Sequence, residues 1–304
     1  MKKILICDAL AAEALDQLES VTEFDVTLKT GMDEQALITT IPGFNAAVVR
    51  SATKITDKVI AAADELEIIV RAGIGLDNVD VAAAEAQGIQ VNNTPSATTI
   101  TVAEHTFGLM LGAVRHHGPA NLSMKAHKWE KKLFKGSELY QKTLGIIGSG
   151  RIGLAVAERA LAFGMTVMVF DIVDVHTDLQ ITQVSLDELL SRSDLISLHL
   201  PHNKSTHHLV SDDQFAKMKD GVIIVNAARG GVVDESALLK ALESGKVRAA
   251  AVDVYEAEPA QNFALIDHPA VTATPHIGAA ADEGQKRAGL EVVKILKEKF
   301  SCNL

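Results

Sequence analysis

Three polar residues in the C-terminal half of the sequence are of types that together suit hydride-transfer chemistry: Arg229, Glu258 and His276. Each follows a short apolar run of the kind that forms a buried strand. A histidine titrates near neutral pH, and a carboxylate beside it fixes its tautomer and favours its protonated form. An arginine forks onto a carboxylate or carbonyl oxygen. The set suits oxidation of an alcohol, in which a base takes the hydroxyl proton as hydride leaves carbon.

Each of these residues alone also has an ordinary structural explanation. A glutamate caps helices or forms ion pairs, an arginine can be structural, and a histidine can bind the backbone. The carboxyl ends of parallel strands meet at one edge of an open sheet, and ligands bind there. The shared position of the three residues therefore favours the catalytic interpretation.

A glycine pattern upstream predicts the partner in hydride transfer. Gly148, Gly150 and Gly153 have G-x-G-x-x-G spacing between a strand-like run, 144–147, and a helical segment, 154–163. The first glycine permits a tight turn, the second lets a pyrophosphate approach the backbone, and the third lets helix and strand pack closely. The intervening Arg151 and Ile152 belong to the helical turn whose N–H groups would face the phosphates.

The next strand-like run, 166–170, ends at Asp171, 18 residues after Gly153 (171 − 153). A carboxylate at about this distance accepts hydrogen bonds from the adenosine ribose of NAD. Residues 172–183 contain no Lys or Arg but do contain Asp174 and Asp178. These charges would repel a 2′-phosphate, so the sequence favours NAD over NADP. The alternative is a glycine turn that binds no dinucleotide.

The elements that would position these residues alternate between short apolar runs and longer Ala-, Leu- and Glu-rich segments. This alternation predicts an α/β fold with parallel strands. Nine strands are expected, at 3–7, 46–49, 67–70, 144–147, 166–170, 195–198, 222–225, 249–254 and 271–273. A Thr-, Asn- and Ser-rich stretch, 92–101, is a candidate connection between domains and precedes a helical pattern at 102–116. Ser185 and Glu188 have the spacing of a capping box, and 282–300 reads as an amphipathic helix.

Composition excludes several classes of function. The chain has 304 residues, with 29 Lys and Arg against 39 Asp and Glu, so its net charge of −10 disfavours nucleic-acid binding. Two cysteines, Cys7 and Cys302, make no disulfide framework and suit a reducing compartment. No signal peptide or membrane span is evident, so a cytoplasmic protein is predicted. The eleven histidines include adjacent pairs rather than ligand spacings, and no metal is expected.

Five segments, in order along the chain, resemble the motifs of the D-isomer-specific 2-hydroxyacid dehydrogenases. They are 71–80, 148–153, 226–231, 253–259 and 275–278. The resemblance covers nearly the whole chain. Within the family it is closest to the phosphoglycerate dehydrogenases, through 49–54, the Arg71 loop, 128–132, 136–139 and 142–145. It implies an α/β fold with two Rossmann-like, doubly wound parallel sheets and a cleft between them. Residues 1–97 with 283–304 would form the substrate-binding domain and 98–282 the NAD-binding domain.

The resemblance also implies roles for individual residues. Arg229 would anchor the substrate, Glu258 would orient the histidine, and His276 would be the acid and base. Further nucleotide contacts would come from Leu200, Ala227, Asp253 and Gly278, with Arg229 and His276 also facing the cofactor. The backbone of Ala72, Gly73 and Ile74 would receive the substrate carboxylate. A homodimer through the nucleotide domain is expected.

The activity implied is NAD-dependent oxidation of 3-phospho-D-glycerate to 3-phosphohydroxypyruvate, the first step of serine biosynthesis. A doubly anionic substrate needs positive charge beyond Arg229, and the candidates are Arg50, Arg71, Lys131 and Lys132. The two lysines also fit a solvated surface. The alternatives are a reductase of glyoxylate, hydroxypyruvate or another 2-keto acid, and a catalytically silent NAD-binding module that recruits partners.

Two features depart from the family pattern. Tyr255 stands where phenylalanine is more frequent, and Ala280 and Ala281 replace the usual Ser or Thr after the histidine motif. The sequence ends at Leu304, which predicts a short form without the C-terminal serine-sensing domain of many phosphoglycerate dehydrogenases, and hence no inhibition by serine through that route.

Overall fold

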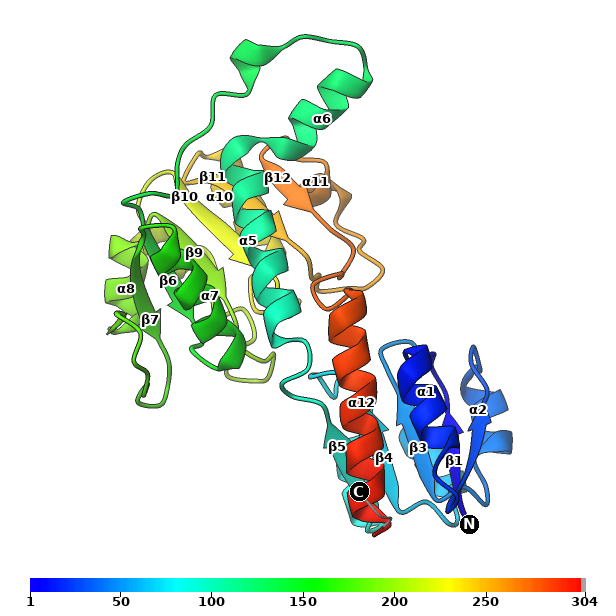
Figure 1. Cartoon of the computed structure of the whole chain (residues 1–304). Coiled ribbons are helices and arrows are strands. Elements are labelled where there is room, and N and C mark those ends of the chain that lie inside the picture. The colour runs from blue at the N-terminus through cyan, green and yellow to red at the C-terminus, as the bar shows by residue number, and fades with distance from the viewer. Residues whose placement is uncertain (302–304) are drawn as a thin grey trace. The chain divides into compact units, whose positions relative to one another are not determined.

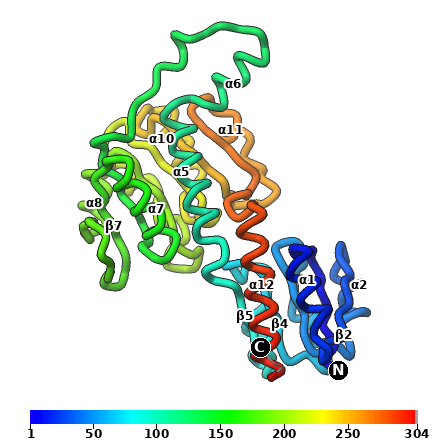
Figure 2. Tube along the Cα trace, viewed as in Figure 1, coloured from blue at the N-terminus to red at the C-terminus, as the bar shows by residue number. Residues whose placement is uncertain are grey.

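A computed structural model describes residues 1–301 of the chain, so Cys302 lies outside the described residues. The chain divides into two compact units (Figures 1 and 2). Unit 1 comprises Met1–Thr101 with the C-terminal segment from Ala279, and unit 2 comprises Val102–Gly278. Each unit is built on a single parallel sheet, which confirms the predicted α/β class. No helix within residues 1–301 is long and apolar enough to cross a membrane.

Unit 1 has a five-stranded parallel sheet of order β2-β1-β3-β4-β5. Its strands are β1 (Lys2–Ile6), β2 (Phe24–Leu28), β3 (Ala46–Val49), β4 (Ile68–Arg71) and β5 (Gln90–Asn93). Its helices are α1 (Ala12–Glu19), α2 (Glu34–Thr40), α3 (Asp57–Ala62), α4 (Val81–Ala86) and α12 (Asp282–Lys299). One face of the sheet packs against α1 and α12, and the other packs against α2, α3 and α4.

The last helix completes the N-terminal unit. Figures 1 and 2 show α12 beside α1, and a Cβ atom at Gly289 would lie only 2.6 Å from the Cβ of Ala14. Only glycine permits this approach of the two helices. The buried side chains of α12 include Val292 and Leu296, which join the core under the sheet. Because β-α-β connections cover both faces, the central strand β3 is buried at every residue.

Unit 2 has a seven-stranded parallel sheet of order β12-β11-β10-β9-β6-β7-β8. Its strands are β6 (Thr143–Ile147), β7 (Thr166–Phe170), β8 (Thr182–Gln183), β9 (Leu195–Leu198), β10 (Val222–Asn226), β11 (Val247–Val252) and β12 (Val271–Ala273). Its helices are α5 (Thr99–Arg115), which begins at the end of unit 1, α6 (His117–Lys125), α7 (Arg151–Ala162), α8 (Leu186–Arg192), α9 (Asp212–Lys217), α10 (Glu235–Glu243) and α11 (Phe263–Ile266), with a 3-10 helix η1 (Lys131–Leu133).

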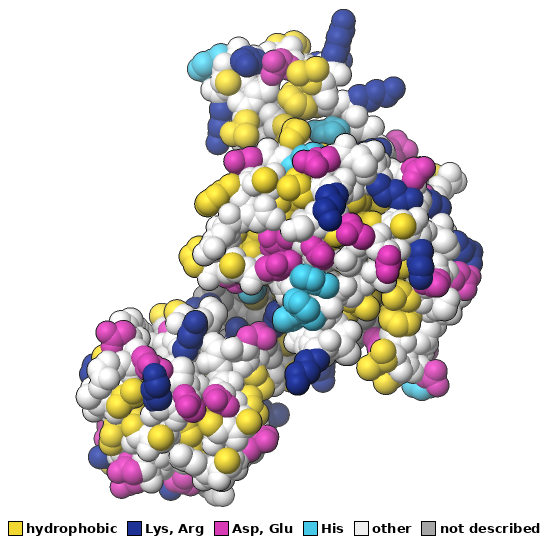
Figure 3. All heavy atoms as spheres, turned by 180° about the vertical axis from the view of Figure 1, so that it is seen from behind, with side chains coloured by type: hydrophobic (Ala, Val, Ile, Leu, Met, Phe, Trp, Pro, Cys, Tyr) yellow, Lys and Arg dark blue, Asp and Glu magenta, His cyan; other side chains and the backbone are white. Residues whose placement is uncertain are grey.

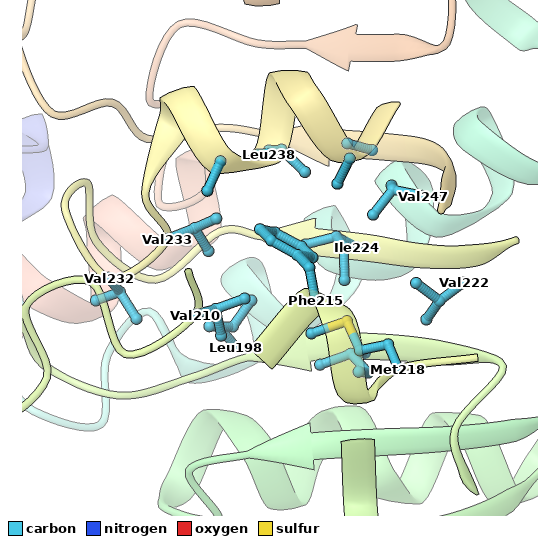
Figure 4. Packing of buried hydrophobic residues seen from close by; sticks show 14 of the residues in the cluster. Leu198, Val210, Phe215, Met218, Val222, Ile224, Val232, Val233, Leu238 and Val247 are labelled. Carbon is cyan, nitrogen blue, oxygen red and sulfur yellow. The ribbon is translucent and has the colours of Figure 1, made fainter. Parts of the chain in front are cut away.

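Two apolar layers hold this sheet. Helices α5 and α7 cover one face, and α8, α9 and α10 cover the other. Figure 4 shows the second layer, where Phe215, Ile224 and Leu238 gather between the helices and the sheet. Strand order reverses between β6 and β9, so a ligand-binding crevice is expected at the carboxyl ends of these strands.

The capping box predicted at Ser185 is confirmed only in part. The Ser185 hydroxyl accepts the Glu188 N–H at 3.3 Å at the start of α8, as expected. The Glu188 side chain does not return to Ser185, however, but pairs with Arg192 one turn later. The capping box is therefore only half formed, because a guanidinium offers Glu188 a charged partner on the same helix face.

Candidate active site

The glycine loop has the geometry that a dinucleotide needs. Gly148 has a φ of 92°, and a Cβ atom there would lie 2.4 Å from the carbonyl oxygen of His199. A Cβ atom at Gly153 would lie 2.1 Å from the Gly148 carbonyl oxygen. At Gly150, by contrast, a Cβ atom would meet nothing within 4 Å, because this residue faces open space. The first and third glycines are thus required for packing, and the second leaves room for a ligand.

Helix α7 begins directly after Gly150, which is its N-cap and provides no side-chain cap. No acidic residue lies in the first turn, which contains Arg151 and Ile152. The N–H groups of this turn and the helix dipole therefore suit a pyrophosphate. On this chemistry the residues present fit NAD.

Asp171 follows β7 and ties the glycine loop to the neighbouring strand. Its carboxylate accepts the Ser149 N–H at 2.7 Å and the Ser149 hydroxyl at 3.0 Å, and its other oxygen accepts the Ile172 N–H at 2.8 Å. Burial would raise the pKa of Asp171, but these hydrogen bonds hold it below its usual value. Asp171 is therefore a carboxylate at neutral pH, and it orders the loop on which a cofactor would lie.

The pair formed by Glu258 and His276 is the most distinct of the candidate catalytic features. The Nδ1 atom of His276 lies 2.7 Å from the Oε2 atom of Glu258. The other oxygen, Oε1, accepts the Tyr255 N–H at 3.2 Å. Both side chains are about half exposed, with 46% and 40% of their surface open. This contact commits Nδ1 to the carboxylate and leaves Nε2 of the ring to face a substrate.

The backbone around His276 is held in an unusual conformation. His276 has a φ of 53°, in the left-handed region, which is uncommon for residues other than glycine although Asn, Asp and His adopt it more often than the rest. Its N–H donates to the carbonyl oxygen of Asp253 at 2.8 Å. The Tyr255 hydroxyl donates to the carbonyl oxygen of Thr274 at 2.9 Å. Phenylalanine would lack this bond, so the departure at Tyr255 adds a contact to the histidine loop.

Arg229 lies on the loop after β10, next to the loop that carries Glu258. Asn226, which is almost fully buried, donates to the Arg229 carbonyl oxygen at 3.1 Å and accepts the Ala228 N–H at 3.1 Å. A Cβ atom at Gly230 would lie 1.7 Å from the Tyr255 carbonyl oxygen, so the two loops are in direct contact. The structure thus brings the Arg229 loop and the Glu258 loop together at the carboxyl edge of the sheet.

The remaining predicted nucleotide contacts lie at the same edge. Leu200 follows β9 and lies beside Gly148, since a Cβ atom on the glycine would be 3.2 Å from the Leu200 Cβ. Ala227 follows β10 and is buried, and Gly278 donates its N–H to Asp253 at 2.8 Å. Asp253 accepts hydrogen bonds from residues on both sides of His276, so it supports the loop that carries this histidine.

Unit 1 carries the predicted substrate loops. Arg50 follows β3 and Arg71 ends β4, and Val49 and Arg71 are paired across the two strands. The guanidinium of Arg71 lies over Gly73, whose missing Cβ atom would be 1.5 Å from Nη1. Asp8 holds the Arg50 loop by accepting the Arg50 N–H at 2.6 Å. Two guanidinium groups are therefore carried by neighbouring strand ends.

Further supports hold these loops in place. Asn78 donates to the carbonyl oxygens of Arg50 and Thr53, at 2.7 and 2.6 Å, and Asn93 donates to that of Ile74 at 2.6 Å. Buried Ala72 donates its N–H to Val49. The other candidates, Lys131 and Lys132, lie exposed on η1 in unit 2, and no hydrogen bond or ion pair described for residues 1–301 joins either of them to the three catalytic candidates.

Sequence reasoning missed several residues that organise this site, chiefly Ser149, Asn226 and Thr274. Asn226 lies within a family motif, and Ser149 occupies a variable position of the glycine pattern, so their positions were available as signals. Thr274 carries no such signal. Among residues 1–301, no group of three or more His, Cys, Asp or Glu side chains is placed to hold a metal ion.

Comparisons with known proteins agree on one family. Residues 107–278 match the D-isomer specific 2-hydroxyacid dehydrogenase NAD-binding domain. The chain is 49% identical to hydroxypyruvate reductase of Thermotoga maritima over 97% of this chain and 98% of that protein. It is 46% identical to D-3-phosphoglycerate dehydrogenase of Methanocaldococcus jannaschii over 98% of this chain and 57% of that protein. The chain therefore spans little more than half the length of the second relative.

Solved structures resemble the chain over nearly its whole length. A glyoxylate reductase from Paecilomyes thermophila has a TM-score of 0.89 at 36% identity, covering 100% of this chain and 97% of that one. D-lactate dehydrogenase from Aquifex aeolicus, complexed with NAD and lactic acid, has a TM-score of 0.87 at 30% identity, covering 98% and 95%.

Proposed function

The chain belongs to the D-isomer-specific 2-hydroxyacid dehydrogenases, and we propose that within this family it oxidises 3-phospho-D-glycerate to 3-phosphohydroxypyruvate, the first step of serine biosynthesis. The family relation makes it an NAD-dependent oxidoreductase acting on a small 2-hydroxy acid. The observation that supports the phosphorylated substrate is the pair of arginines, Arg50 and Arg71, on neighbouring strand ends of unit 1.

His276 is the proposed acid and base. Its Nδ1 atom is engaged by Glu258 at 2.7 Å, so Nε2 is the atom that takes the C2 hydroxyl proton during oxidation and returns it during reduction. Glu258 keeps the ring in this orientation and stabilises the imidazolium that forms. NAD, bound at the glycine loop, supplies the acceptor for the hydride that leaves C2.

Arg229 is the proposed anchor for the substrate at C1 and C2. Its guanidinium can fork onto the carboxylate or polarise the carbonyl oxygen. The backbone N–H groups of 72–74 would take the carboxylate, and Arg50 and Arg71 the phosphate. The proposal assigns unit 1 to substrate binding and unit 2 to NAD.

Reduction of unphosphorylated hydroxypyruvate is the second candidate. It is favoured by the similarity to the Thermotoga maritima hydroxypyruvate reductase, which extends over 98% of that protein. This reaction uses the same Arg229, Glu258 and His276 but needs no phosphate site. The two candidates therefore differ only in what Arg50 and Arg71 bind.

A substrate panel followed by NADH absorbance separates the candidates. We expect kcat/KM for 3-phosphohydroxypyruvate to exceed that for hydroxypyruvate, glyoxylate and pyruvate by at least about tenfold, the effect of one charge-assisted contact. Arg71→Met should raise KM for the phosphorylated substrate while leaving KM for hydroxypyruvate within about twofold. Higher kcat/KM for hydroxypyruvate would establish the second candidate, and NADH binding without turnover on any substrate would establish a silent module.

We also propose that the chain is a cytoplasmic homodimer that associates through residues 117–140 of unit 2. This segment, which contains α6 and η1, projects beyond the sheet (Figure 1), and Figure 3 shows hydrophobic side chains among its lysines. Its exposed apolar residues are Leu122, Met124, Trp129, Leu133 and Tyr140. Such a patch is typical of a protein interface. Sedimentation equilibrium of Trp129→Glu against the unaltered chain tests it: a dimer that persists in the variant would contradict the proposal.

A further inference from the structure

An almost fully buried carboxylate lies under the loop that carries His276. Asp253 follows β11 and is 1% exposed. Its Oδ1 atom accepts the Thr274 hydroxyl at 2.6 Å and the Ile277 N–H at 2.8 Å, and its Oδ2 atom accepts the Gly278 N–H at 2.8 Å. Its carbonyl oxygen accepts the His276 N–H at 2.8 Å. Asp253 therefore forms hydrogen bonds with the loop on both sides of His276.

The hydrogen bonds to the Asp253 side chain depend on the ionised form of the carboxylate. A protonated Asp253 would lose acceptor capacity while four donors, those of Thr274, Ile277, Gly278 and His105, still point at it. Burial raises the pKa of Asp253, but hydrogen bonds, first that of His105 and then that of Thr274, bring it below its usual value. The interactions that keep Asp253 charged therefore also keep the loop in place.

His105, on helix α5, reaches this network from outside the loop. Its Nε2 atom lies 3.3 Å from Asp253 Oδ1 and 3.3 Å from Thr274 Oγ1. Thr274 gives its single hydroxyl hydrogen to Asp253, so Nε2 of His105 must carry a hydrogen to bind either oxygen. The ring also packs at the end of the loop, since a Cβ atom at Gly278 would lie 3.7 Å from its Cδ2 atom.

The rest of α5 does not demand a polar residue here. On the face of α5 that carries His105, Val102 and Leu109 are buried apolar residues, and the His105 side chain is only 20% exposed. An aliphatic side chain would fill this position with less desolvation of polar atoms. What only a donor provides is the hydrogen bond to the Asp253 and Thr274 oxygens.

We propose that His105 is a positioning residue for hydride transfer, acting through Asp253 and Thr274 to hold the 274–278 loop and hence the His276 ring. The proposal rests on the proposed function for its kinetic consequence, but its structural part is independent of the substrate. His105 itself touches neither Glu258 nor His276 in any contact described for residues 1–301.

Two substitutions of equal length separate the hydrogen bond from the packing. His105→Gln keeps an N–H donor at the reach of Nε2, whereas His105→Met has a similar shape and no donor. Both are good helix formers, so both should fold, and thermal denaturation checks this.

Hydrogen exchange of the peptide 270–280, followed by mass spectrometry, reads the loop directly. In His105→Met we expect the amides of 276–278 to exchange about tenfold faster than in the unaltered chain, and in His105→Gln within about twofold of it. With 3-phosphohydroxypyruvate or the best substrate of the panel, kcat should fall about tenfold in His105→Met and recover in His105→Gln, while KM for NADH stays within about twofold.

The pH profile adds a readout that packing alone would not move. Loss of the His105 donor raises the pKa of Asp253, so the acidic limb of kcat should shift to higher pH in His105→Met only. Unchanged exchange in His105→Met, or equal effects of Met and Gln, would overturn the proposal. If the unaltered chain turns over no substrate, the proposed function fails, while the exchange measurement still decides the role of His105.

Discussion

Replacing Glu258 by glutamine is the most direct test of the catalytic pair, because the carboxylate serves two donors at once. Oε2 faces His276 Nδ1 at 2.7 Å, and Oε1 accepts the Tyr255 N–H at 3.2 Å. A carboxamide has only one oxygen. If that oxygen keeps Tyr255, the amide nitrogen faces the ring and donates to Nδ1, which forces the hydrogen onto Nε2. The ring then has the wrong tautomer for taking a proton from the substrate.

The size of the effect follows from the two outcomes available to the glutamine. If it keeps the correct tautomer, the loss is one charge-assisted hydrogen bond, about 1.5 kcal/mol for a half-exposed pair, or about tenfold in rate. If the tautomer inverts, general base catalysis is lost, which is about 10²- to 10⁴-fold. We expect kcat for oxidation to fall about 10²- to 10³-fold, with KM for NAD within about threefold.

Steady-state NADH formation by Glu258→Gln measures this, and Glu256→Gln is the matched control. Glu256 is also exposed, and its carboxylate binds His208 at 3.1 Å and the Glu235 N–H at 3.0 Å rather than the catalytic ring. The control should keep kcat within about twofold. A Glu258→Gln enzyme with kcat within about threefold of the unaltered chain would refute the role assigned to the carboxylate.

Three other predictions concern the cofactor loop, the buried cysteine and the acid side of stability. Gly153→Ala should weaken NADH binding at least about tenfold in a fluorescence titration, because the added Cβ atom would lie 2.1 Å from the Gly148 carbonyl oxygen. Gly108→Ala is the control, because a Cβ atom there would meet no atom within 4 Å. Burial raises the pKa of Cys7 to about 12, so in a Cys302→Ser background the native chain should not react with a thiol reagent at about pH 8. The pKa of Asp253 is lowered in the fold, so its ionised form stabilises the chain above about pH 4 and this contribution is lost as pH falls; Asp253→Asn should flatten that loss in urea denaturation.

The strands that could be predicted are those whose burial leaves a continuous apolar run. β3, β9 and β10 are buried at every residue, and each was predicted within a residue of its end. The three strands that were missed, β2, β5 and β8, lie at sheet edges, and most of their residues are half exposed or fully exposed. An edge strand pairs with a neighbour along one side only, and its other side faces solvent. Polar residues such as those of Gln90–Asn93 therefore interrupt the apolar run from which a strand is predicted.

The identities of the candidate catalytic residues could be predicted, but their arrangement could not. Residue type and position after a strand indicate Arg229, Glu258 and His276. The left-handed backbone at His276 cannot be read from the sequence, because it depends on contacts with Asp253, 23 residues earlier (276 − 253). His105 is still less visible, since a single histidine in an apolar helix usually indicates no more than a satisfied core position.

The carboxyl edge of the unit 2 sheet thus has two kinds of supporting residue, and they differ in what a substitution can reveal. Asp253 follows β11. It donates its N–H to Asn226 of the neighbouring strand β10 and accepts hydrogen bonds from the loop that carries His276. Its loss would therefore disturb both the sheet and the site. Any fall in activity would then be mixed with a fall in stability. His105 lies on helix α5, on one face of the sheet. It contributes one donor to Oδ1 of Asp253, the atom that also accepts the Ile277 N–H. Because its packing can be matched by methionine and its donor by glutamine, it separates the order of the catalytic loop from the stability of the fold.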